Sequence, residues 1–429
     1  FYKNVYKSAH KGNYDIYVVF VEKGLSLLNK NGHLGYILPN KFLSTDYGFP
    51  LREHLANKKV LDSLIDFGHS QVFESATTYT CLMFLNTSRP EKFKYADIEP
   101  KNIISDNFQS NIMQSESLTA TAWIFGSKES NALFDKLKIK SITLLDVPAS
   151  MSRGSSSGAD DIYCLQRKGE HYLTRKGELI DIEKEMLRQP IYATDFTRYN
   201  FNPKNDESII FPYFVSDAGY KMIDEEALRD RWPKTYKYLY SNKKDLEKRK
   251  QFNQWYGFSA PRNLNVHEHA NLLVPLLANR GLFSPMPTEA EKFCLMASGG
   301  FSVSIAKKKT DLNPFYILGL LNSNLLYWCL ARISNKFSSG WITCTKQYFG
   351  TLPIHNINFN DSAEKKMHDQ MVQLVEQMLL LNKQLAEVKT SHDQTLLQRQ
   401  IDATDKQIDK LVYELYGLTE DEIKIVEGR

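Results

Sequence analysis

The sequence predicts an α/β region at the start of the chain, an α+β region in the middle and a helical hairpin at the end. Three observations lead to this division. Helix-spaced apolar residues alternate with short apolar strands between residues 14 and 85, many short segments separated by turns follow from residue 144, and a seven-residue apolar repeat begins near residue 361. Since 429 residues exceed what one hydrophobic core usually covers, we expect regions at 1–90, 91–142, 143–357 and 358–429.

The α/β region corresponds to half of a doubly wound sheet. The expected helices cover residues 14–29 and 48–56, and the expected strands cover 33–38, 60–67 and 78–85. The pair Asn31-Gly32 supplies the turn between the first helix and the first strand. The other half of such folds usually carries a Gly-rich nucleotide-binding turn, and the sequence has none ahead of Tyr14.

The stretch 91–142 has mixed character, and we expect it to connect two domains. It contains a polar segment over 109–117 and a short helical pattern over 127–137. The α+β region that follows holds most of the aromatic and basic residues, and its richest Gly and Ser loops cover 152–158 and 298–301.

An uncharged apolar run covers residues 315–331. Asn322, Ser323 and Asn324 lie in its middle, where a lipid bilayer would leave their polar groups unsatisfied. The run therefore predicts a pair of buried helices, and we expect no membrane association.

The C-terminal repeat changes phase once. Apolar residues step by four and three from Met367 to Val388, and again from Leu397 to Leu415 in a different phase. Two antiparallel helices joined near residues 390–393 explain this change better than one long helix does. Exposed seams of this type also invite self-association or a protein partner through residues 361–417.

The net charge of +4 is unevenly divided. Residues 361–429 carry a net charge of −5, so residues 1–360 carry +9, together with most of the 52 aromatic residues of the chain. A basic body with aromatic side chains is typical of nucleic-acid binding, although a solvated lysine surface has the same composition.

Cysteine and histidine usage excludes several classes of site. Five well-separated cysteines without a Cys-x-x-Cys pair indicate neither a disulfide framework nor structural zinc, and they favour a reducing, cytoplasmic location. His267 and His269 have no third ligand nearby, so we expect no metal site. The sequence contains no P-loop, nucleophile elbow or paired-carboxylate motif either.

An ordered set of short motifs runs through the α/β region: YDIYVVFVE at 14–22, LLNKNGHLGYILPNKF at 27–42, LR at 51–52, IDFG at 65–68 and VFESATT at 72–78. This set resembles the post-catalytic half of a gamma-class, adenine-specific DNA methyltransferase, as found in type IIG restriction-modification enzymes. GADDIY at 158–163, FPY at 211–213, WY at 255–256, LLNS at 320–323 and LPI at 352–354 are similar to a TaqI-like target recognition domain. IDKLVYELYGLT at 408–419 is similar to the end of many type IIG chains.

The resemblance implies a fold, a cofactor and a partner. The α/β region would be the second half of a Rossmann-like methyltransferase sheet, the cofactor of the parent enzyme S-adenosylmethionine, and the partner double-stranded DNA from which an adenine is flipped. The donor-binding glycine motif and the Asn/Asp-Pro-Pro-Tyr motif of such enzymes are absent from this sequence. We therefore expect this fragment to be inactive alone and to supply duplex recognition.

The resemblance also suggests individual roles. Phe73 matches the position whose ring stacks on the flipped adenine, with a core Phe at a strand end as the alternative. Phe20 matches a position that packs against the adenine ring of the donor, with plain core packing as the alternative.

Arg153 is the first candidate for a base or phosphate contact, because small neighbouring residues let the backbone approach DNA and Arg pairs bidentately with guanine. A solvated loop arginine is the alternative. The further DNA-binding candidates are Arg198, Tyr199, Lys248, Arg249, Trp255, Arg262 and Lys307. The charge run around Lys248 also fits a solvated helix face.

A second interpretation keeps the DNA binding and drops the enzyme. In it the chain is a specificity or interaction subunit whose C-terminal helices dock a separate catalytic subunit.

Overall fold

The computed structural model describes residues 1–73, 78–104, 108–203, 206–216, 218–306, 309–334 and 341–428, without the side chains of residues 69, 104 and 128. These residues form two compact units. Unit 1 consists of Phe1–Lys136 and Cys329–Thr343, and unit 2 of Leu137–Trp328 and Cys344–Arg429.

Unit 1 contains one mixed sheet. Its strands are β1 (His33–Pro39), β2 (Leu61–Gln71), β3 (Tyr79–Asn86), β4 (Lys92–Asp97) and β5 (Asn111–Gln114). Its helices are α1 (Tyr2–Val5), η1 (Lys7–Ala9), α2 (Tyr17–Ser26), η2 (Asn40–Leu43), η3 (Asp46–Gly48), α3 (Phe49–Lys58), α4 (Lys101–Ile104) and η4 (Ser115–Ser117), while α5 (Lys128–Ile139) extends past the boundary of the unit. The five strands lie in the order β1-β3-β2-β4-β5.

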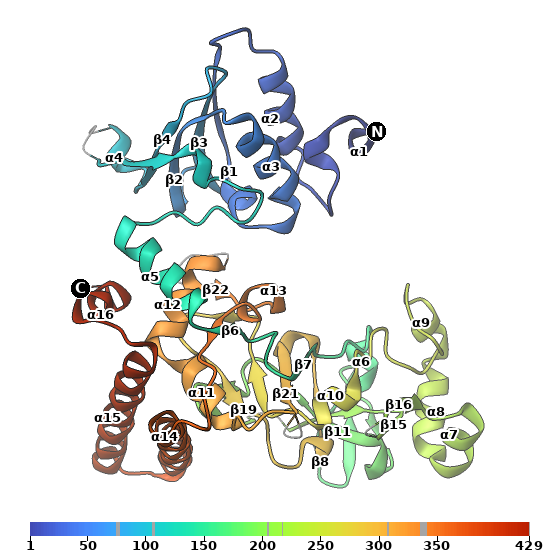
Figure 1. Cartoon of the computed structure of the whole chain (residues 1–429). Helices are drawn as coiled ribbons and strands as arrows, with labels where there is room; N and C mark the ends of the chain where they lie inside the picture. Colours follow the sequence, from blue (N-terminus) through green and yellow to red (C-terminus); the bar gives the residue numbers. More distant parts are fainter. Residues whose placement is uncertain are drawn as a thin grey trace. The chain divides into compact units, whose positions relative to one another are not determined.

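The helices α2 and α3 pack on one face of this sheet (Figure 1). Val18 and Leu25 of α2 and Leu51 of α3 are buried against Leu64 and Met83 of the strands, because their helical spacing places these apolar side chains on one side. All five elements expected between residues 14 and 85 are present, and the first helix is shorter than expected.

The stretch expected to be a connector belongs to unit 1 instead. Its residues form β4 and β5, and Phe93, Tyr95 and Trp123 are buried in the same core as α2 and α3. The strands are short and partly polar, so hydrophobic periodicity did not distinguish them from a loop. The boundary that we expected at residue 90 therefore falls inside one folded unit.

Unit 2 contains several small sheets. Its strands are β6 (Ile142–Thr143), β7 (Ala149–Arg153), β8 (Cys164–Lys168), β9 (His171–Leu173), β10 (Leu179–Ile180), β11 (Leu187–Ile191), β12 (Phe196–Thr197), β13 (Asn200–Phe201), β14 (Glu207–Ile210), β15 (Tyr213–Ser216), β16 (Gly219–Met222), β17 (Leu272–Val274), β18 (Leu277–Ala278), β19 (Ser284–Pro285), β20 (Phe293–Leu295), β21 (Phe301–Ile305) and β23 (Pro353–Ile354). The strand β22 (Ile342–Thr343) belongs to unit 1. The two larger sheets have the orders β10-β9-β8-β14-β11-β20 and β19-β17-β21-β7.

Short helices surround these sheets, and longer helices end the chain. They are α6 (Asp160–Tyr163), η5 (Lys184–Met186), α7 (Glu225–Arg231), α8 (Pro233–Ser241), α9 (Lys243–Glu247), α10 (Leu264–Glu268), η6 (Ala290–Lys292), η7 (Ala297–Gly299), α11 (Pro314–Asn322), α12 (Asn324–Ile333), α13 (Lys346–Phe349), α14 (Ser362–Glu387), α15 (Ser391–Tyr416) and α16 (Glu420–Glu427). This mixture agrees with the α+β region expected from the sequence.

The apolar run 315–331 forms two helices, α11 and α12, which break at Ser323. Asn322 is fully buried, and its side chain pairs with the main chain of Phe283: its Nδ2 donates to the carbonyl oxygen at 2.9 Å, and its Oδ1 accepts from the amide at 3.0 Å. Among the helices that the structure describes, none is long and apolar enough to cross a membrane. The buried helix pair expected from these polar residues is confirmed.

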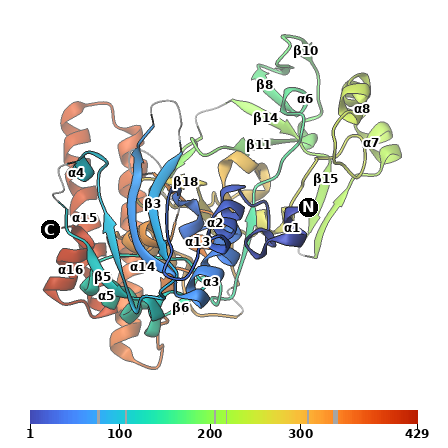
Figure 2. The same ribbon diagram turned by 90° about the horizontal axis from the view of Figure 1, so that it is seen from above.

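The C-terminal hairpin is also confirmed. The helices α14 and α15 lie side by side (Figures 1 and 2), and Thr390 caps α15 by accepting from the amide of Asp393. α14 in turn packs closely on α11, where a Cβ on Gly319 would lie 2.4 Å from the sulfur of Met371. The short helix α16 was not expected.

A buried polar network attaches α15 to the rest of unit 2. Arg198 donates from Nη1 to Asp405 Oδ2 at 2.5 Å and from Nη2 to the carbonyl of Asn322. Asp409 caps α12, since its Oδ1 accepts from the amide of Asn324 at 2.7 Å and its Oδ2 from the Asn324 side chain at 2.8 Å. The polar residues that break the apolar run thus also hold the hairpin.

This network predicts a pH-dependent stability. Burial, and then the charge of Asp405, raise the pKa of Asp409 from 3.8 to about 6, although the Asn324 amide and Arg198 oppose the shift. A raised pKa in the folded state means that the stabilising contribution is complete below about pH 4 and is lost as the pH rises through about 6. Relative to Asp409→Asn, the free energy of unfolding of the unmodified chain should fall by about 2 kcal/mol between about pH 4 and pH 7. Urea unfolding of both proteins across this range measures the difference, and a constant difference would contradict the assignment.

Candidate functional site

A cavity of about 650 Å3 lies in unit 1, at the carboxyl ends of strands that run in the same direction. β1 and β2 both pair antiparallel with β3, and β4 pairs parallel with β2, so all three end at one edge of the sheet. Asn40 follows β1 directly, and Asp66 of β2 is in register with Asp97, the last residue of β4. Ligands of open α/β sheets usually bind at this edge.

Hydrogen bonds fix the polar floor of the cavity. Asn40 donates from Nδ2 to Asp66 Oδ1 and to the carbonyl of Gly68, both at 2.8 Å, and the Gly68 amide donates to Asp66 Oδ1 at 3.0 Å. Gly68 has a φ of +55°, which favours glycine and lets its amide turn back towards Asp66. Asn40 and Asp66 are therefore held in one orientation.

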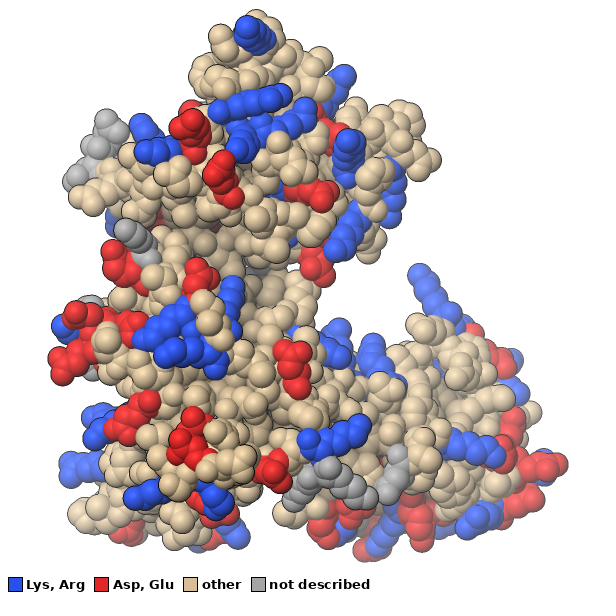
Figure 3. Space-filling model, viewed as in Figure 1, with Lys and Arg blue, Asp and Glu red and all other residues tan. Residues whose placement is uncertain are grey.

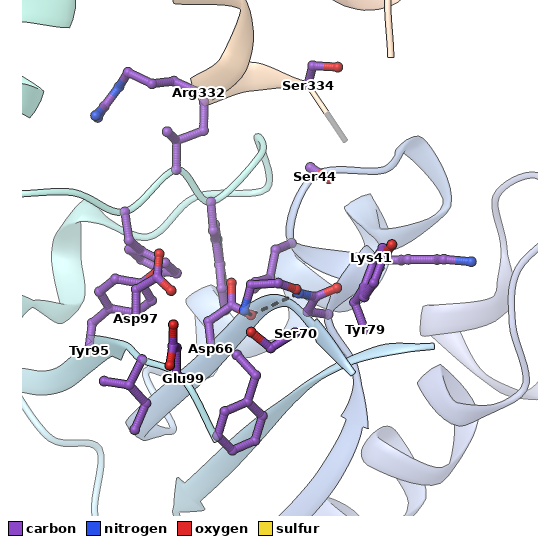
Figure 4. Close-up of a pocket in the computed structure, with 18 residues that line it drawn as sticks. Lys41, Ser44, Asp66, Ser70, Tyr79, Tyr95, Asp97, Glu99, Arg332 and Ser334 are labelled. Carbon is purple, nitrogen blue, oxygen red and sulfur yellow. Dashed lines mark hydrogen bonds between the residues drawn. The ribbon is translucent and has the colours of Figure 1, made fainter. Parts of the chain in front are cut away.

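Aromatic rings and further carboxylates form the walls. Tyr95 and Phe125 stack with ring centroids 4.3 Å apart, and Trp123 lies 6.2 Å from Phe125. The labelled carboxylates of Asp66, Asp97 and Glu99 lie in the same part of the cavity as Tyr95 (Figure 4).

Burial raises the pKa of Tyr95, and the charges of Asp66 and Asp97 raise it further, so its hydroxyl stays protonated at neutral pH. Carboxylates accept hydrogen bonds from amino groups, and aromatic walls pack on flat rings. The cavity therefore suits a flat ring that carries an amino group. Among the residues that the structure describes, no group of three or more His, Cys, Asp or Glu side chains is placed to hold a metal ion.

Arg52 positions the loop that carries Asn40. Its side chain is buried, and its Nη1 donates to the carbonyls of Phe42 at 2.5 Å and Thr45 at 2.9 Å. Its Nε donates to the carbonyls of Ala120 at 3.0 Å and Thr121 at 2.8 Å, just before Trp123. Two walls of the cavity thus depend on one guanidinium.

The two aromatic residues expected in the catalytic half are both solvent-accessible. Phe20 is 61% exposed on α2, so the core packing that we considered for it is wrong. Phe73 is 45% exposed, and the residues 74–77 of its motif lie outside the part of the chain that the structure describes. Both rings are available for stacking.

Arg153 and Arg262 lie together in unit 2. Arg153 is exposed at the end of β7, and Arg262 donates from Nη1 to the carbonyl of the next residue, Gly154, at 2.7 Å. Burial and the nearby positive charge of Arg153 lower the pKa of Arg262. Sequence reasoning named both residues without indicating that they are neighbours.

The loop after Arg153 is packed, which corrects our expectation of a flexible segment. A Cβ on Gly154 would lie 2.1 Å from the Met296 carbonyl oxygen, and the Gly154 amide donates to the carbonyl of Gly300 at 2.9 Å. Ser155 and Ser157 are fully buried. Small residues are needed here because two backbone segments pass close to each other.

Several expected DNA contacts are used inside the fold. Arg198 holds Asp405, Tyr199 is 2% exposed, and Trp255 is 6% exposed with its indole nitrogen donating to Glu225 at 3.2 Å. Arg249 donates to the carbonyls of Leu246, Ser157, Gly257 and Trp255 at 2.5–2.8 Å. These four residues are not favoured as DNA contacts, because Tyr199 and Trp255 are buried and the guanidinium groups of Arg198 and Arg249 donate to carboxylate and carbonyl groups of the fold.

Two basic candidates remain to be placed. Lys248 is exposed and pairs with Asp245 at 2.7 Å, so its ammonium group lies at the surface. Lys307 lies outside the described residues. On the face drawn in Figure 3, basic and acidic side chains are mixed over each unit, so charge alone does not mark a DNA surface there.

Comparison with known proteins shows what this chain is similar to. Residues 1–73 match a family model described as Eco57I restriction-modification methylase. Over 99% of its length the chain is 28% identical to the type II restriction enzyme and methyltransferase RM.Eco57I of Escherichia coli, and it is 22% identical over 99% of its length to the type II methyltransferase M.BstVI of Geobacillus stearothermophilus. The chain is homologous to type II restriction-modification methyltransferases.

The chain spans 45% of the length of RM.Eco57I and 70% of the length of M.BstVI. Its fold is similar to that of the type IIL restriction-modification enzyme MmeI, solved in complex with DNA, with a TM-score of 0.61 and 11% identity over 97% of this chain and 52% of that chain. The homology confirms the resemblance that the ordered motifs indicated.

The sequence analysis did not identify the cavity of unit 1. Asn40, Arg52 and Asp66 lie in motifs that it used for recognition, but it gave them no role, and Asp97 lies in the presumed connector. The available signal was positional, since Asn40 follows one predicted strand and Asp66 ends another.

The clamp formed by Arg52 predicts a large effect of its removal. Arg52→Met should lower the free energy of unfolding by roughly 3 kcal/mol or more, because four carbonyls lose a charged donor. Urea unfolding followed by circular dichroism measures it. Lys92→Met, which removes an exposed charge from β4, is the matched control; equal unfolding midpoints for the two variants would show that Arg52 is not a clamp.

Proposed function

We propose that the chain is part of an S-adenosylmethionine-dependent, site-specific DNA adenine-N6 methyltransferase of a type IIG restriction-modification enzyme. Within that enzyme, unit 1 is the second half of the methyltransferase domain and unit 2 is the target recognition domain followed by the hairpin. One observation carries the proposal: the similarity to RM.Eco57I runs through both units and covers 99% of the chain.

The cavity of unit 1 supports a role in handling a nucleobase. Asp66 and Asp97 offer acceptors for an exocyclic amino group, and Trp123 and Tyr95 offer flat apolar walls. The exposed ring of Phe73 is a candidate stacking partner for a flipped adenine, since an extruded base needs a π-face to replace its lost stacking.

The donor has one candidate contact in this chain. The exposed ring of Phe20 fits stacking on the adenine ring of S-adenosylmethionine, which supplies the methyl group when bound. The sequence lacks the glycine-bearing donor motif and the Pro-Pro-Tyr motif. The residues present therefore orient a base and stack on the donor, and they do not complete a site for methyl transfer.

A methyl-transfer assay tests this division of roles. The chain alone should leave duplex DNA unlabelled when incubated with S-adenosylmethionine that carries a tritiated methyl group, because the motif that holds the attacking amine is missing. An active adenine methyltransferase serves as the positive control. Tritium in DNA adenine above the level without protein would refute the expectation.

DNA recognition by the chain is tested by selection from a random pool of duplexes at moderate salt. An enriched motif that contains adenine is expected. Lys248→Ala should weaken binding to all sequences alike. It should also reduce the slope of the logarithm of the binding constant against the logarithm of the salt concentration by about one. Lys292→Ala, which removes an equally exposed lysine paired with an acid three residues away, is the control. Binding without any enrichment would remove specific recognition from the proposal.

A specificity subunit that docks a separate catalytic subunit is the second candidate. Leu380 and Leu396 favour it, because they are 56% and 50% exposed on the hairpin. Light scattering distinguishes the two candidates. If the chain is a monomer and stays monomeric with Leu380→Glu, the result gives no support to docking. If the chain forms an assembly and the variant disperses it, the result supports docking.

A further inference from the structure

Arg153 and Arg262 form a site of two positive charges without a counter-charge. Among the described residues no carboxylate pairs with Arg153, and Arg262 Nη1 donates to the carbonyl of Gly154. Because Gly154 follows Arg153, this hydrogen bond places the Arg262 guanidinium beside the end of β7, and the positive charge of Arg153 lowers the pKa of Arg262. Like charges repel, so this arrangement weakens the fold unless something outside the chain uses it.

The backbone under these residues is rigid. β7 pairs with β21 in a register that sets Arg153 opposite Phe301, and the Gly154 amide bonds to Gly300 immediately afterwards. Ser156 exchanges two main-chain hydrogen bonds with Ala260, at 2.9 and 3.0 Å. Arg153 is thus presented from a fixed strand end.

The second arginine is held in an unfavourable conformation. Arg262 and Asn263 have φ values of +49° and +54°, in the left-handed region that costs a non-glycine residue free energy. The Ser152 hydroxyl donates to the Arg262 carbonyl at 3.0 Å and secures this turn. Strained residues of this kind gather at ligand contacts more often than elsewhere.

A buried histidine packs against the backbone of the pair. His267 is buried below it and shares a hydrogen bond of 2.7 Å with the Ser302 hydroxyl. Burial lowers the pKa of His267 to about 4, so the ring is neutral at physiological pH. The side chain of Arg153 is exposed, so its positive charge is accessible from outside.

We propose that Arg153 is a specificity-determining residue that reads a guanine in the major groove of duplex DNA, with Arg262 as a fixed positive charge behind it. The inference rests on the proposed function, because it names the base that the recognition unit contacts. The guanidinium donates to O6 and N7 of guanine, the two acceptors that guanine presents side by side in the major groove.

The rigid presentation favours a base over a phosphate. Many kinds of side chain and backbone amides contact phosphates without reading sequence, whereas a specific contact is held most precisely by a side chain on a rigid strand or helix. Lys248, on its short helix, is of the first kind, and Arg153, on a paired strand between locked segments, is of the second.

Selection from the random duplex pool tests the inference when it is repeated with Arg153→Ala and Arg153→Lys. The unmodified chain should enrich a motif with one required guanine. Both variants should lose the preference for that guanine by roughly 10- to 100-fold and keep the other positions, because a lysine keeps the charge and lacks the paired donors. Lys410→Ala removes an exposed charge from α15 and should leave the motif unchanged.

Each other outcome overturns the inference. If Arg153→Lys keeps the full motif, or if Arg153→Ala weakens all sequences alike, the residue contacts phosphate. If the unmodified chain enriches a motif without a required guanine, the inference fails and the proposed function stands. If it enriches nothing, specific recognition by this chain fails, and the inference fails with it.

Discussion

Main-chain carbonyls outside regular secondary structure need donors, and in this protein arginine side chains supply many of them. Arg52 serves four carbonyls in unit 1, and Arg249 serves four in unit 2. Arg198 joins a carbonyl and a carboxylate at the base of α15. Because a guanidinium carries several donors in a fixed plane, one side chain can fix two or three segments at once. The short strands and long loops of both units keep their shape through these contacts.

The same contacts decide which basic residues remain for a ligand. In the sequence, Arg198, Arg249, Arg153 and Arg262 look alike, since each lies near glycine, aromatic or other charged residues. The structure separates them by their surroundings: the first two bond to groups of the fold, and Arg153 is exposed and has no ion pair with any residue that the structure describes. Tertiary packing brings carbonyls from distant segments to one side chain, and periodicity cannot show this.

Helices and strands with a strong apolar periodicity could be predicted from the sequence. Strands that are recognisable only from the strands they pair with could not. The helices α2, α3, α14 and α15 carry repeating apolar faces, and the break at Thr390 was visible as a change of phase. β4 and β5 are short and half polar, so the fold of residues 91–114 became evident only from their neighbours. The cavity was hidden for the same reason, since Asp97 stands beside Asp66 only through the parallel pairing of β4 with β2.

At the strand end at residue 153, the backbone contacts that stabilise the fold are separate from the side chain that we propose to contact DNA. Its main chain is held by β21 and by the close approach of Gly154 to Met296, while its side chain is exposed. Residue 153 can therefore be substituted during evolution without changes to the sheet. Selection can then act on the proposed DNA contact while the stability of the fold stays constant. Under the proposed role of Arg153, a new base preference needs only a single codon change at this position, and the rest of the scaffold is inherited unaltered.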